Sequence, residues 1–135
     1  QLPPRWHFNA SRLESFLESL GSEFRYAFEF RDRSWQNRET TELLGRHNAA
    51  FCIYELEGFQ SPEFNTADFI YVRLHGPDGA YQGSYSHQAL SARAETFSGW
   101  ARQGKTVYCY FDNDQLGYAA KNAGQLRKIL SQLPL

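Results

Sequence analysis

The sequence has no run of apolar residues long enough to cross a membrane and no segment that resembles a signal peptide. A membrane-spanning helix needs about 20 consecutive apolar residues, so we expect no membrane partner. Cysteine is also scarce, since the chain has only Cys52 and Cys109, and each lies inside a run typical of a strand. Because of these positions we interpret both as buried, reduced thiols. Reduced cysteines are typical of cytosolic proteins, in which disulfides are rare, so we expect a cytoplasmic location.

The sequence also lacks an excess of charge of either sign. The 14 basic and 15 acidic residues leave a formal net charge of −1 at pH 7. A protein that attracts nucleic acid or an anionic membrane by its overall field carries a strong positive balance, so the charge does not favour a nucleic-acid partner. The sequence has no exact internal repeat and no low-complexity segment. With 135 residues, 41% of them hydrophobic, the chain is predicted to form a single domain with a buried core.

The stretch at residues 69–86 concentrates the residues that carry chemistry. It begins with the apolar run FIYVRL, which contains Arg73, and continues through His75 into a loop rich in glycine and tyrosine. Buried parallel strands are almost continuously apolar, and the functional side chains of α/β folds gather at the carboxyl ends of such strands. An arginine and a histidine at a strand end therefore indicate a candidate site.

The rest of the chain alternates between strand-like and helix-like segments. This alternation predicts an α/β fold in which parallel strands are joined by right-handed crossovers. The last helix is expected to bury Leu116 and Ala123 on its apolar face, together with Ala119, Leu126 and Leu130. The expected strands are 26–31, 49–56, one that begins at Phe69 and runs into Arg73, and 106–114, after a strand end at 1–4. The expected helices are 9–21, 32–48, 86–104 and 115–133, with an irregular connection at 57–68.

Four segments of the chain are similar, in order, to a known family. They are YAFEFRDRSW, CIYEL, ADFIYVRLHG-x-DGAY-x-G-x-YS and VYCYFDND-x-x-G-x-A-x-x-NA, and they resemble the YecE-like family, domain of unknown function 72. The resemblance implies a (β/α) barrel of the TIM type, normally twice as long as this chain. Residues 1–135 would then be one domain, a half-barrel of about four βα units that carries strands five to eight. The family name assigns no biochemical role.

Polar side chains at the strand ends form the candidate site. Glu29 and Arg31 share one parity of their strand, and Arg73 and His75 share one parity of theirs, whereas the residues between them are apolar. Alternate residues of a barrel strand point inward, so we expect the polar set to line the mouth of the barrel. Three further polar residues stand at the corresponding ends of the other two strands: Glu55, Asp112 and Asn113.

These residue types favour an anion site. Arg31 and Arg73 can clamp a phosphate or carboxylate, and His75 can move a proton with Glu29 or Asp112 as its partner. One hypothesis is therefore a hydrolase or lyase that acts on a phosphorylated or sugar-containing substrate. The alternative is a module that binds a nucleotide or a nucleic-acid end without chemistry. The sequence identifies no cofactor, and its carboxylates and histidine lack the local spacing of a metal site.

Several of these residues also have a structural interpretation. Tyr81 and Tyr85 in the glycine-rich loop suit stacking on a base or sugar, but they equally suit a plain connecting loop. Trp35 can cover the mouth or belong to the core. The charged set can also pair internally, as Glu29 with Arg73 and Arg31 with Glu55, and fill the barrel interior.

A half-barrel has an open face. Its first and last strands would expose backbone donors and acceptors at their edges, and its inward face would bare apolar area. We therefore expect that the chain is not a stable isolated monomer. It would either pair with a second copy or belong to a longer chain with a further amino-terminal half.

Overall fold

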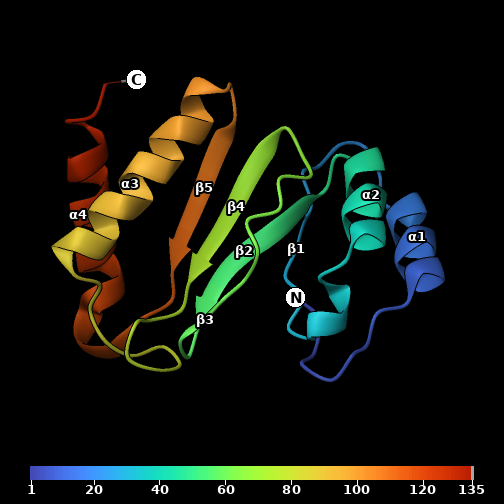
Figure 1. The fold of residues 1–135 in the computed structure, drawn as a ribbon, viewed down its shortest axis with the longest axis horizontal. Coiled ribbons are helices and arrows are strands. Elements are labelled where there is room, and N and C mark those ends of the chain that lie inside the picture. Colours follow the sequence, from blue (N-terminus) through green and yellow to red (C-terminus); the bar gives the residue numbers. More distant parts are fainter. Residues whose placement is uncertain (135) are drawn as a thin grey trace. The chain divides into compact units, whose positions relative to one another are not determined.

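The structure is a computed structural model, and it describes residues 1–134. Figure 1 shows the elements along the chain. The helices are α1 (Ala10–Ser19), α2 (Arg38–Arg46), α3 (His87–Arg102) and α4 (Tyr118–Leu130), with the 3₁₀ turns η1 (Arg33–Trp35) and η2 (Gln115–Gly117); the strands are β1 (Ala27–Phe28), β2 (Ala50–Leu56), β3 (Phe59–Gln60), β4 (Phe69–Leu74) and β5 (Thr106–Phe111).

The strands form one sheet in the order β1-β2-β4-β5, and β3 pairs with β2 outside this order. β1 runs parallel to β2, with Ala27 opposite Ala50 and Phe28 opposite Phe51. The arrows of β4 and β5 point the same way in Figure 1. The short β3 is antiparallel to β2. The expected α/β fold with parallel strands is therefore confirmed, and it is consistent with half of a TIM-type barrel.

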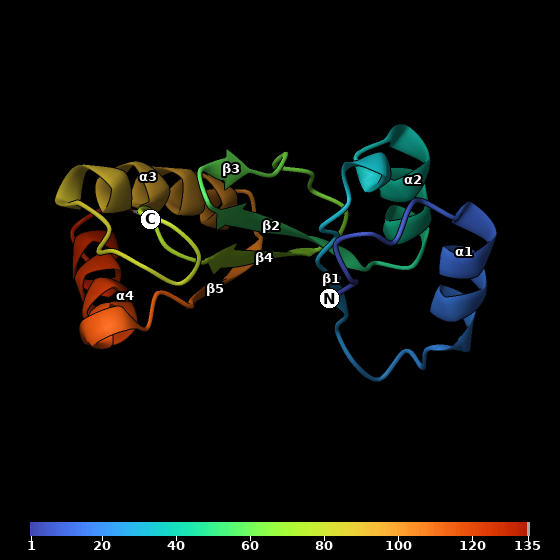
Figure 2. The ribbon, with the colours of Figure 1, turned by 90° about the horizontal axis from the view of Figure 1, so that it is seen from below.

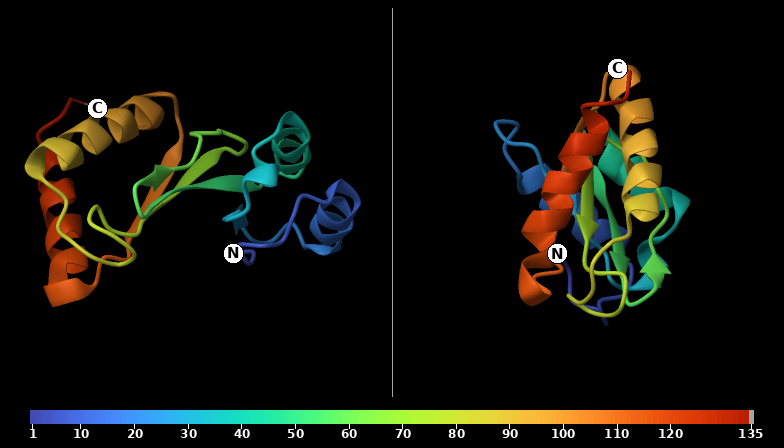
Figure 3. Two further views of the ribbon diagram at one scale, coloured as in Figure 1. Left: turned by 60° about the horizontal axis from the view of Figure 1, so that its bottom comes forward. Right: turned by 90° about the vertical axis from the view of Figure 1, so that its left-hand side faces the viewer.

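The chain divides into two compact units. The first unit comprises Gln1–Ile53 and Pro62–Tyr71, and the second comprises Tyr54–Ser61 and the residues from Val72 onward. In the second unit α3 and α4 lie side by side, as Figures 2 and 3 show. The polar residues that end β4 and β5 also belong to this second unit.

The first unit is built around an aromatic core. The side chain of Asn9 accepts the backbone N–H of Arg12 at 3.0 Å and so begins α1 as predicted. Trp35 is buried, its ring stacks on Phe30 at 4.5 Å, and its Nε1–H donates to the backbone oxygen of Trp6 at 2.7 Å. Burial of two large rings with every polar atom paired makes this stack a major source of stability in the unit.

The core of the second unit forms where α3 packs against the sheet. The hydroxyl of Ser86 accepts the backbone N–H of Ala89 at 3.1 Å and begins α3 at the predicted residue. Leu90, Ala94 and Phe97 are buried on one face of this helix. Their spacing of three and four residues is the one that a helix requires to present a single apolar face.

Several expected elements are shorter than the sequence pattern predicted, and the last strand, expected at 106–114, ends at Phe111. The strand expected at 26–31 is regular only over Ala27–Phe28, and beyond it the backbone oxygen of Glu29 accepts the N–H of Leu2 at 3.0 Å. The helix expected at 32–48 is split, because Asp32 caps the 3₁₀ turn η1 and Asn37 begins α2 anew. Hydrogen bonds from the Ser34 side chain and backbone lower the pKa of Asp32. Local side-chain caps here override the longer apolar period.

The last helix also differs from the prediction. Leu116 has φ +53° and is 83% exposed, and Gly117 with φ +73° precedes α4, so the regular helix begins at Tyr118. Ala123 is exposed, whereas Asn122 is buried. The predicted burial of Leu116 and Ala123 is therefore wrong, whereas that of Ala119 and Leu126 is right. Leu116 lies outside the regular helix, and the buried stripe of α4 passes through Asn122 and not through Ala123.

Two smaller expectations concern the connection at 57–68 and the cysteines. The connection is not wholly irregular, since it contains β3 after a tight turn at Glu57 and Gly58, both with positive φ. Cys52 and Cys109 are free thiols as predicted, although Cys109 is half-buried rather than buried. Within residues 1–134, no helix has the length and apolar character needed to cross a membrane.

Candidate functional site

Three predicted site residues meet at the carboxyl ends of β4 and β5. Arg73 donates to Oδ2 of Asp112 from Nε at 3.1 Å and from one terminal guanidinium nitrogen at 2.6 Å. Nδ1 of His75 lies 3.2 Å from the same oxygen. Arg73 and His75 therefore lie on one side of β4, while the intervening Leu74 is buried. This is the alternation that the sequence pattern predicted for the strand.

His75 is held in place by backbone hydrogen bonds and by contacts with two aromatic rings. Its backbone N–H donates to the oxygen of Glu55 at 3.0 Å, and its own backbone oxygen accepts the N–H of Tyr81 at 2.6 Å. Its ring is fully buried and makes edge-on contacts with Tyr54 and Tyr81, with centroids 6.3 and 5.6 Å apart. By contrast, the side chains of Arg73 and Asp112 are each about one quarter exposed. The charged pair is accordingly the part of this site that solvent reaches.

The chemistry of this arrangement follows from the shared oxygen. An imidazole that lies beside a carboxylate can carry a proton, and the contact of Nδ1 with Oδ2 is electrostatic, without the geometry of a hydrogen bond. A guanidinium that is partly exposed can be reached by an anion and binds it through its N–H donors. Together these groups can bind a phosphate or carboxylate and move a proton near it. In the part of the chain that the structure describes, no group of three or more His, Cys, Asp or Glu side chains is placed to hold a metal ion.

The loop that follows His75 is tightly folded and requires glycine. Gly76 has φ +118°, and a Cβ atom added there would lie 2.7 Å from the backbone nitrogen of Gln82. Gly83 has φ +84°, and a Cβ atom added there would lie 2.9 Å from Cβ of Asp78. Only glycine combines these dihedral angles with so close an approach. The loop therefore has a defined conformation between its two glycine ends.

Tyr85 holds the beginning of this loop in place. It is buried, its hydroxyl oxygen accepts the backbone N–H of Gly76 at 2.9 Å, and its ring packs edge-on against Phe111. Burial raises the pKa of the Tyr85 hydroxyl, and the charge of Glu55 raises it further. Tyr85 thus offers little surface to a ligand, and the structure gives it the role of holding the loop.

Asn113 and Asn122 anchor the end of the loop. The Nδ2 group of Asn113 donates to the oxygen of Gly83 at 2.8 Å and to Oδ1 of Asn122 at 2.9 Å. The same Oδ1 atom accepts the backbone N–H of Tyr85 at 3.0 Å. Both asparagines are fully buried. Asn113, predicted to bind substrate, therefore joins the strand end to the loop and to α4.

Glu55 lies in a second charged pair. Its Oε2 atom accepts a hydrogen bond from Arg93 of α3 at 3.2 Å, and both side chains are mostly buried. Neither Arg93 nor Asn122 was singled out from the sequence. The signal was present, because Arg93 lies three residues after Leu90 and Asn122 three after Ala119, on the apolar faces of their helices. A polar residue at such a position usually has a buried partner.

The other predicted site residues belong to the first unit. Glu29 and Arg31 form a buried ion pair with each other, and Trp35 lies in the aromatic core. The alternative pairs Glu29–Arg73 and Arg31–Glu55 would link the two units and stay a hypothesis. The convergence of Arg31 with Arg73 and His75 likewise stays a prediction.

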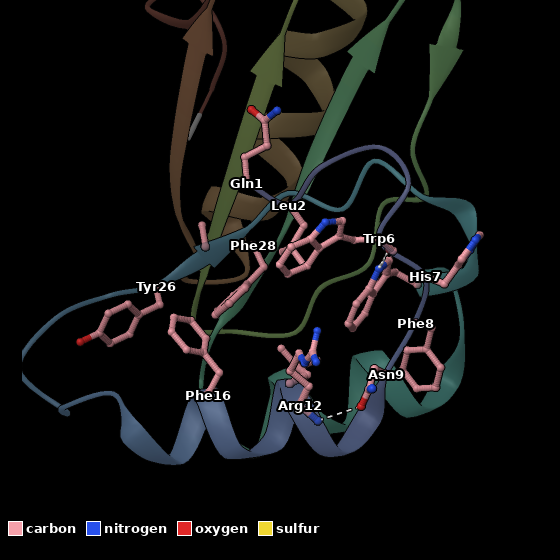
Figure 4. Close-up of a pocket in the computed structure, with 13 residues that line it drawn as sticks. Gln1, Leu2, Trp6, His7, Phe8, Asn9, Arg12, Phe16, Tyr26 and Phe28 are labelled. Carbon is pink, nitrogen blue, oxygen red and sulfur yellow. Dashed lines mark hydrogen bonds between the residues drawn. The ribbon is translucent and has the colours of Figure 1, made fainter.

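The first unit also contains a cavity of about 750 Å³ beside α1. Figure 4 shows the rings of Trp6, Phe8, Phe16 and Phe28 around it, together with the guanidinium of Arg12. Phe16 lies three residues after Leu13 on α1 but is 52% exposed, whereas Leu13 is buried. The cavity is mainly apolar and, apart from Trp35, none of the predicted site residues lines it.

Comparisons with known proteins bear on the family. The sequence matches "Protein of unknown function DUF72" over residues 1–134, whereas no curated protein matches. A DUF72 family protein from Thermotoga maritima has 30% identity and a TM-score of 0.85, over 98% of this chain and 56% of that one. One from Enterococcus faecalis has 17% identity and a TM-score of 0.83, over 100% and 58%. The chain thus spans little more than half the length of these two proteins.

Proposed function

Since the chain belongs to the DUF72 family, whose name assigns no activity, we propose a function from the site itself. Arg73, His75 and Asp112 form an anion site at the carboxyl ends of β4 and β5. Its ligand is a phosphate group, either of a sugar phosphate or of a nucleotide. The proposed activity is that of a hydrolase or lyase, in which His75 carries the proton.

The observation that supports this proposal is a carboxylate oxygen that lies beside two side chains. Oδ2 of Asp112 lies within 3.2 Å of both an arginine nitrogen and a histidine ring nitrogen. The Arg73 and Asp112 side chains are each about one-quarter exposed, so a dissolved anion can reach the pair. An arginine held in place by a carboxylate, with a histidine beside it, is suited to meeting an anion.

In a hydrolytic reaction each residue has a defined task. Arg73 holds the phosphate oxygens, and the Asp112 carboxylate beside Nδ1 stabilises the imidazolium that forms at His75. Nε2 of His75 takes a proton from water as the water oxygen forms the new bond to phosphorus. The leaving oxygen departs with the electron pair of the broken P–O bond and receives a proton from the imidazolium.

A binding module without chemistry is the second candidate function. The observation that favours it is the complete burial of His75, because a general base must come within hydrogen-bond reach of the proton that it removes. In this alternative, Arg73 and Asp112 meet the ligand and His75 only supports Asp112. The bound ligand is then a nucleotide or the end of a nucleic-acid strand.

Calorimetric titration with inorganic phosphate tests the site. Arg73→Ala should weaken phosphate binding at least tenfold, a loss of about 1.4 kcal/mol. Arg38→Ala is the matched control, since Arg38 is an exposed arginine paired with Glu42 on α2, and it should leave binding unchanged. Absence of phosphate binding by the unmodified protein would contradict both candidate functions.

Release of phosphate from a panel of phosphate monoesters separates the two candidates. If the protein is a hydrolase, His75→Gln should abolish release while phosphate binding by Arg73 is retained. If the protein is a binding module, the unmodified chain releases no phosphate although it binds the esters.

A further inference from the structure

Tyr81 is the loop residue that combines exposure with contact to the candidate site. Its side chain is 48% exposed, whereas Tyr85 four residues later is buried. Its ring stands edge-on to His75, with an interplanar angle of 84°. His75 in turn lies 3.2 Å from Asp112, which pairs with Arg73. An exposed aromatic ring and an anion-binding arginine are therefore joined through two intervening side chains.

The geometry leaves the Tyr81 ring available to a ligand. In an edge-on contact, the edge of one ring meets a face of the other, so His75 covers at most one face of the phenol. At least one face is left open by this contact, and the exposure of the residue agrees with that. Flat ligand groups stack on such faces.

The backbone of Tyr81 has a strained conformation. The residue has φ +63°, a conformation that bulky side chains rarely adopt. Its N–H donates to the backbone oxygen of His75 at 2.6 Å, and Gly79 pairs with Gln82 across the tip of the loop. A glycine or asparagine would fit this backbone with less strain. The presence of a large aromatic side chain at this strained position supports a role for the ring in binding.

We propose that Tyr81 determines specificity, by selecting ligands in which the phosphate is attached to a group with a flat ring. The ligand class is the nucleoside monophosphate, with its phosphate on Arg73 and its base on the Tyr81 ring. This inference rests on the proposed anion site and adds the chemistry of the group next to the phosphate. The backbone of the loop is fixed by its own hydrogen bonds. Binding of the base to the Tyr81 ring therefore carries little additional cost in loop entropy.

Three probes test the proposal by calorimetry: inorganic phosphate, ribose 5-phosphate and AMP. Stacking of one base on an aromatic side chain strengthens binding roughly 5- to 150-fold, so AMP should bind at least fivefold more tightly than ribose 5-phosphate. Tyr81→Gly should remove this difference and leave phosphate affinity unchanged. Glycine relieves the strained φ, which protects the variant against misfolding. Tyr81→Phe keeps the ring and should retain the preference.

Phe24→Ala is the control for loss of an exposed ring elsewhere, because Phe24 is 70% exposed in the first unit. It should change none of the three affinities. Equal binding of AMP and ribose 5-phosphate, or a preference for AMP that survives Tyr81→Gly, would overturn the role of Tyr81 and leave the anion site standing. An AMP preference that depends on Tyr81 but not on Arg73 would instead overturn the anion site. Failure of all three probes to bind would overturn both.

Discussion

Nδ1 of His75 lies 3.2 Å from Oδ2 of Asp112, and the two residues differ sharply in exposure. The histidine is fully buried, whereas 27% of the Asp112 side chain is exposed. A ligand that approaches the ends of β4 and β5 would thus meet the carboxylate and its arginine before it meets the imidazole. Asp112 couples the solvent-facing part of the candidate site to its buried part.

Removal of the Asp112 carboxylate should lower stability. Asp112→Ala takes away the acceptor of two Arg73 hydrogen bonds and the partner of buried His75, so we expect a loss of about 1–3 kcal/mol in the free energy of unfolding. Glu42→Ala is the control, because it removes an exposed i,i+4 pair that stabilises a helix by only about 0.3–0.5 kcal/mol. Urea denaturation measures both, and equal losses would contradict the prediction.

Substitution of glycine by alanine should lower stability in the loop and raise it in the helices. Gly76→Ala places Cβ 2.7 Å from a backbone nitrogen at positive φ and should cost about 2 kcal/mol or more. Gly99 and Gly124 lie within α3 and α4 with nothing near the added atom. Alanine at either position should stabilise the protein by about 0.5–1 kcal/mol. Thermal unfolding reports both signs, and a tolerated Gly76→Ala would mean that the loop is not fixed.

Stability should fall at alkaline pH, in part because of Cys109. Burial raises the pKa of this thiol from 9.0 to about 12, so between these values the unfolded chain releases a proton that the folded chain keeps. The linkage slope is then negative, and stability present below pH 9 is lost as pH rises toward 12. Cys109→Ala should have a flatter profile than the unmodified chain when the free energy of unfolding is measured from pH 8.5 to 10.5. Superimposable profiles would show that this thiol ionises normally.

A variant of Arg31 distinguishes between the two interpretations of this residue, as part of the anion site or as part of an internal ion pair. If Arg31 converges with Arg73 on one anion, Arg31→Ala should weaken phosphate binding about tenfold, as Arg73→Ala does. If Arg31 serves only its pair with Glu29, phosphate affinity should stay unchanged and stability alone should fall. Titration and denaturation of the same variant distinguish these results, with Arg38→Ala as the exposed control.

Self-association of the purified chain is also expected. The first unit has an aromatic-lined cavity, β5 carries the half-exposed Tyr110, and the order β1-β2-β4-β5 ends in β5 at one edge. Apolar surface and open strand edges both promote association. Sedimentation velocity should therefore detect dimers or larger species at micromolar concentration. A clean monomer that unfolds cooperatively would contradict the half-barrel interpretation.

Much of the fold could be predicted because short-range signals agreed with long-range packing. Asn9 and Ser86 cap helices at the predicted residues, and the apolar run before Arg73 is a buried strand. Prediction failed where a few backbone dihedral angles decide the outcome. The positive φ of Leu116 leaves this residue outside the regular helix α4, and no apolar period records such an angle.

The candidate site was predictable to the same partial degree. Alternation along the strand correctly placed Arg73 and His75 on one side, because side chains of a strand alternate strictly. The partners were not predictable, because Glu55 pairs with Arg93, 38 residues away in the sequence. Such a contact depends on how a helix packs against the sheet, and the linear spacing of residues does not contain that information.

The paired asparagines have a consequence for local motion. Oδ1 of Asn122 accepts hydrogen bonds from the Tyr85 backbone and from Asn113, so a single atom of α4 ties down both the glycine-rich loop and the strand end. Opening of the loop must break this junction and expose buried amides. The loop and α4 should accordingly exchange their amide hydrogens as one cooperative unit. A segment that looks like a mobile connection in the sequence would then exchange as slowly as the helix that holds it.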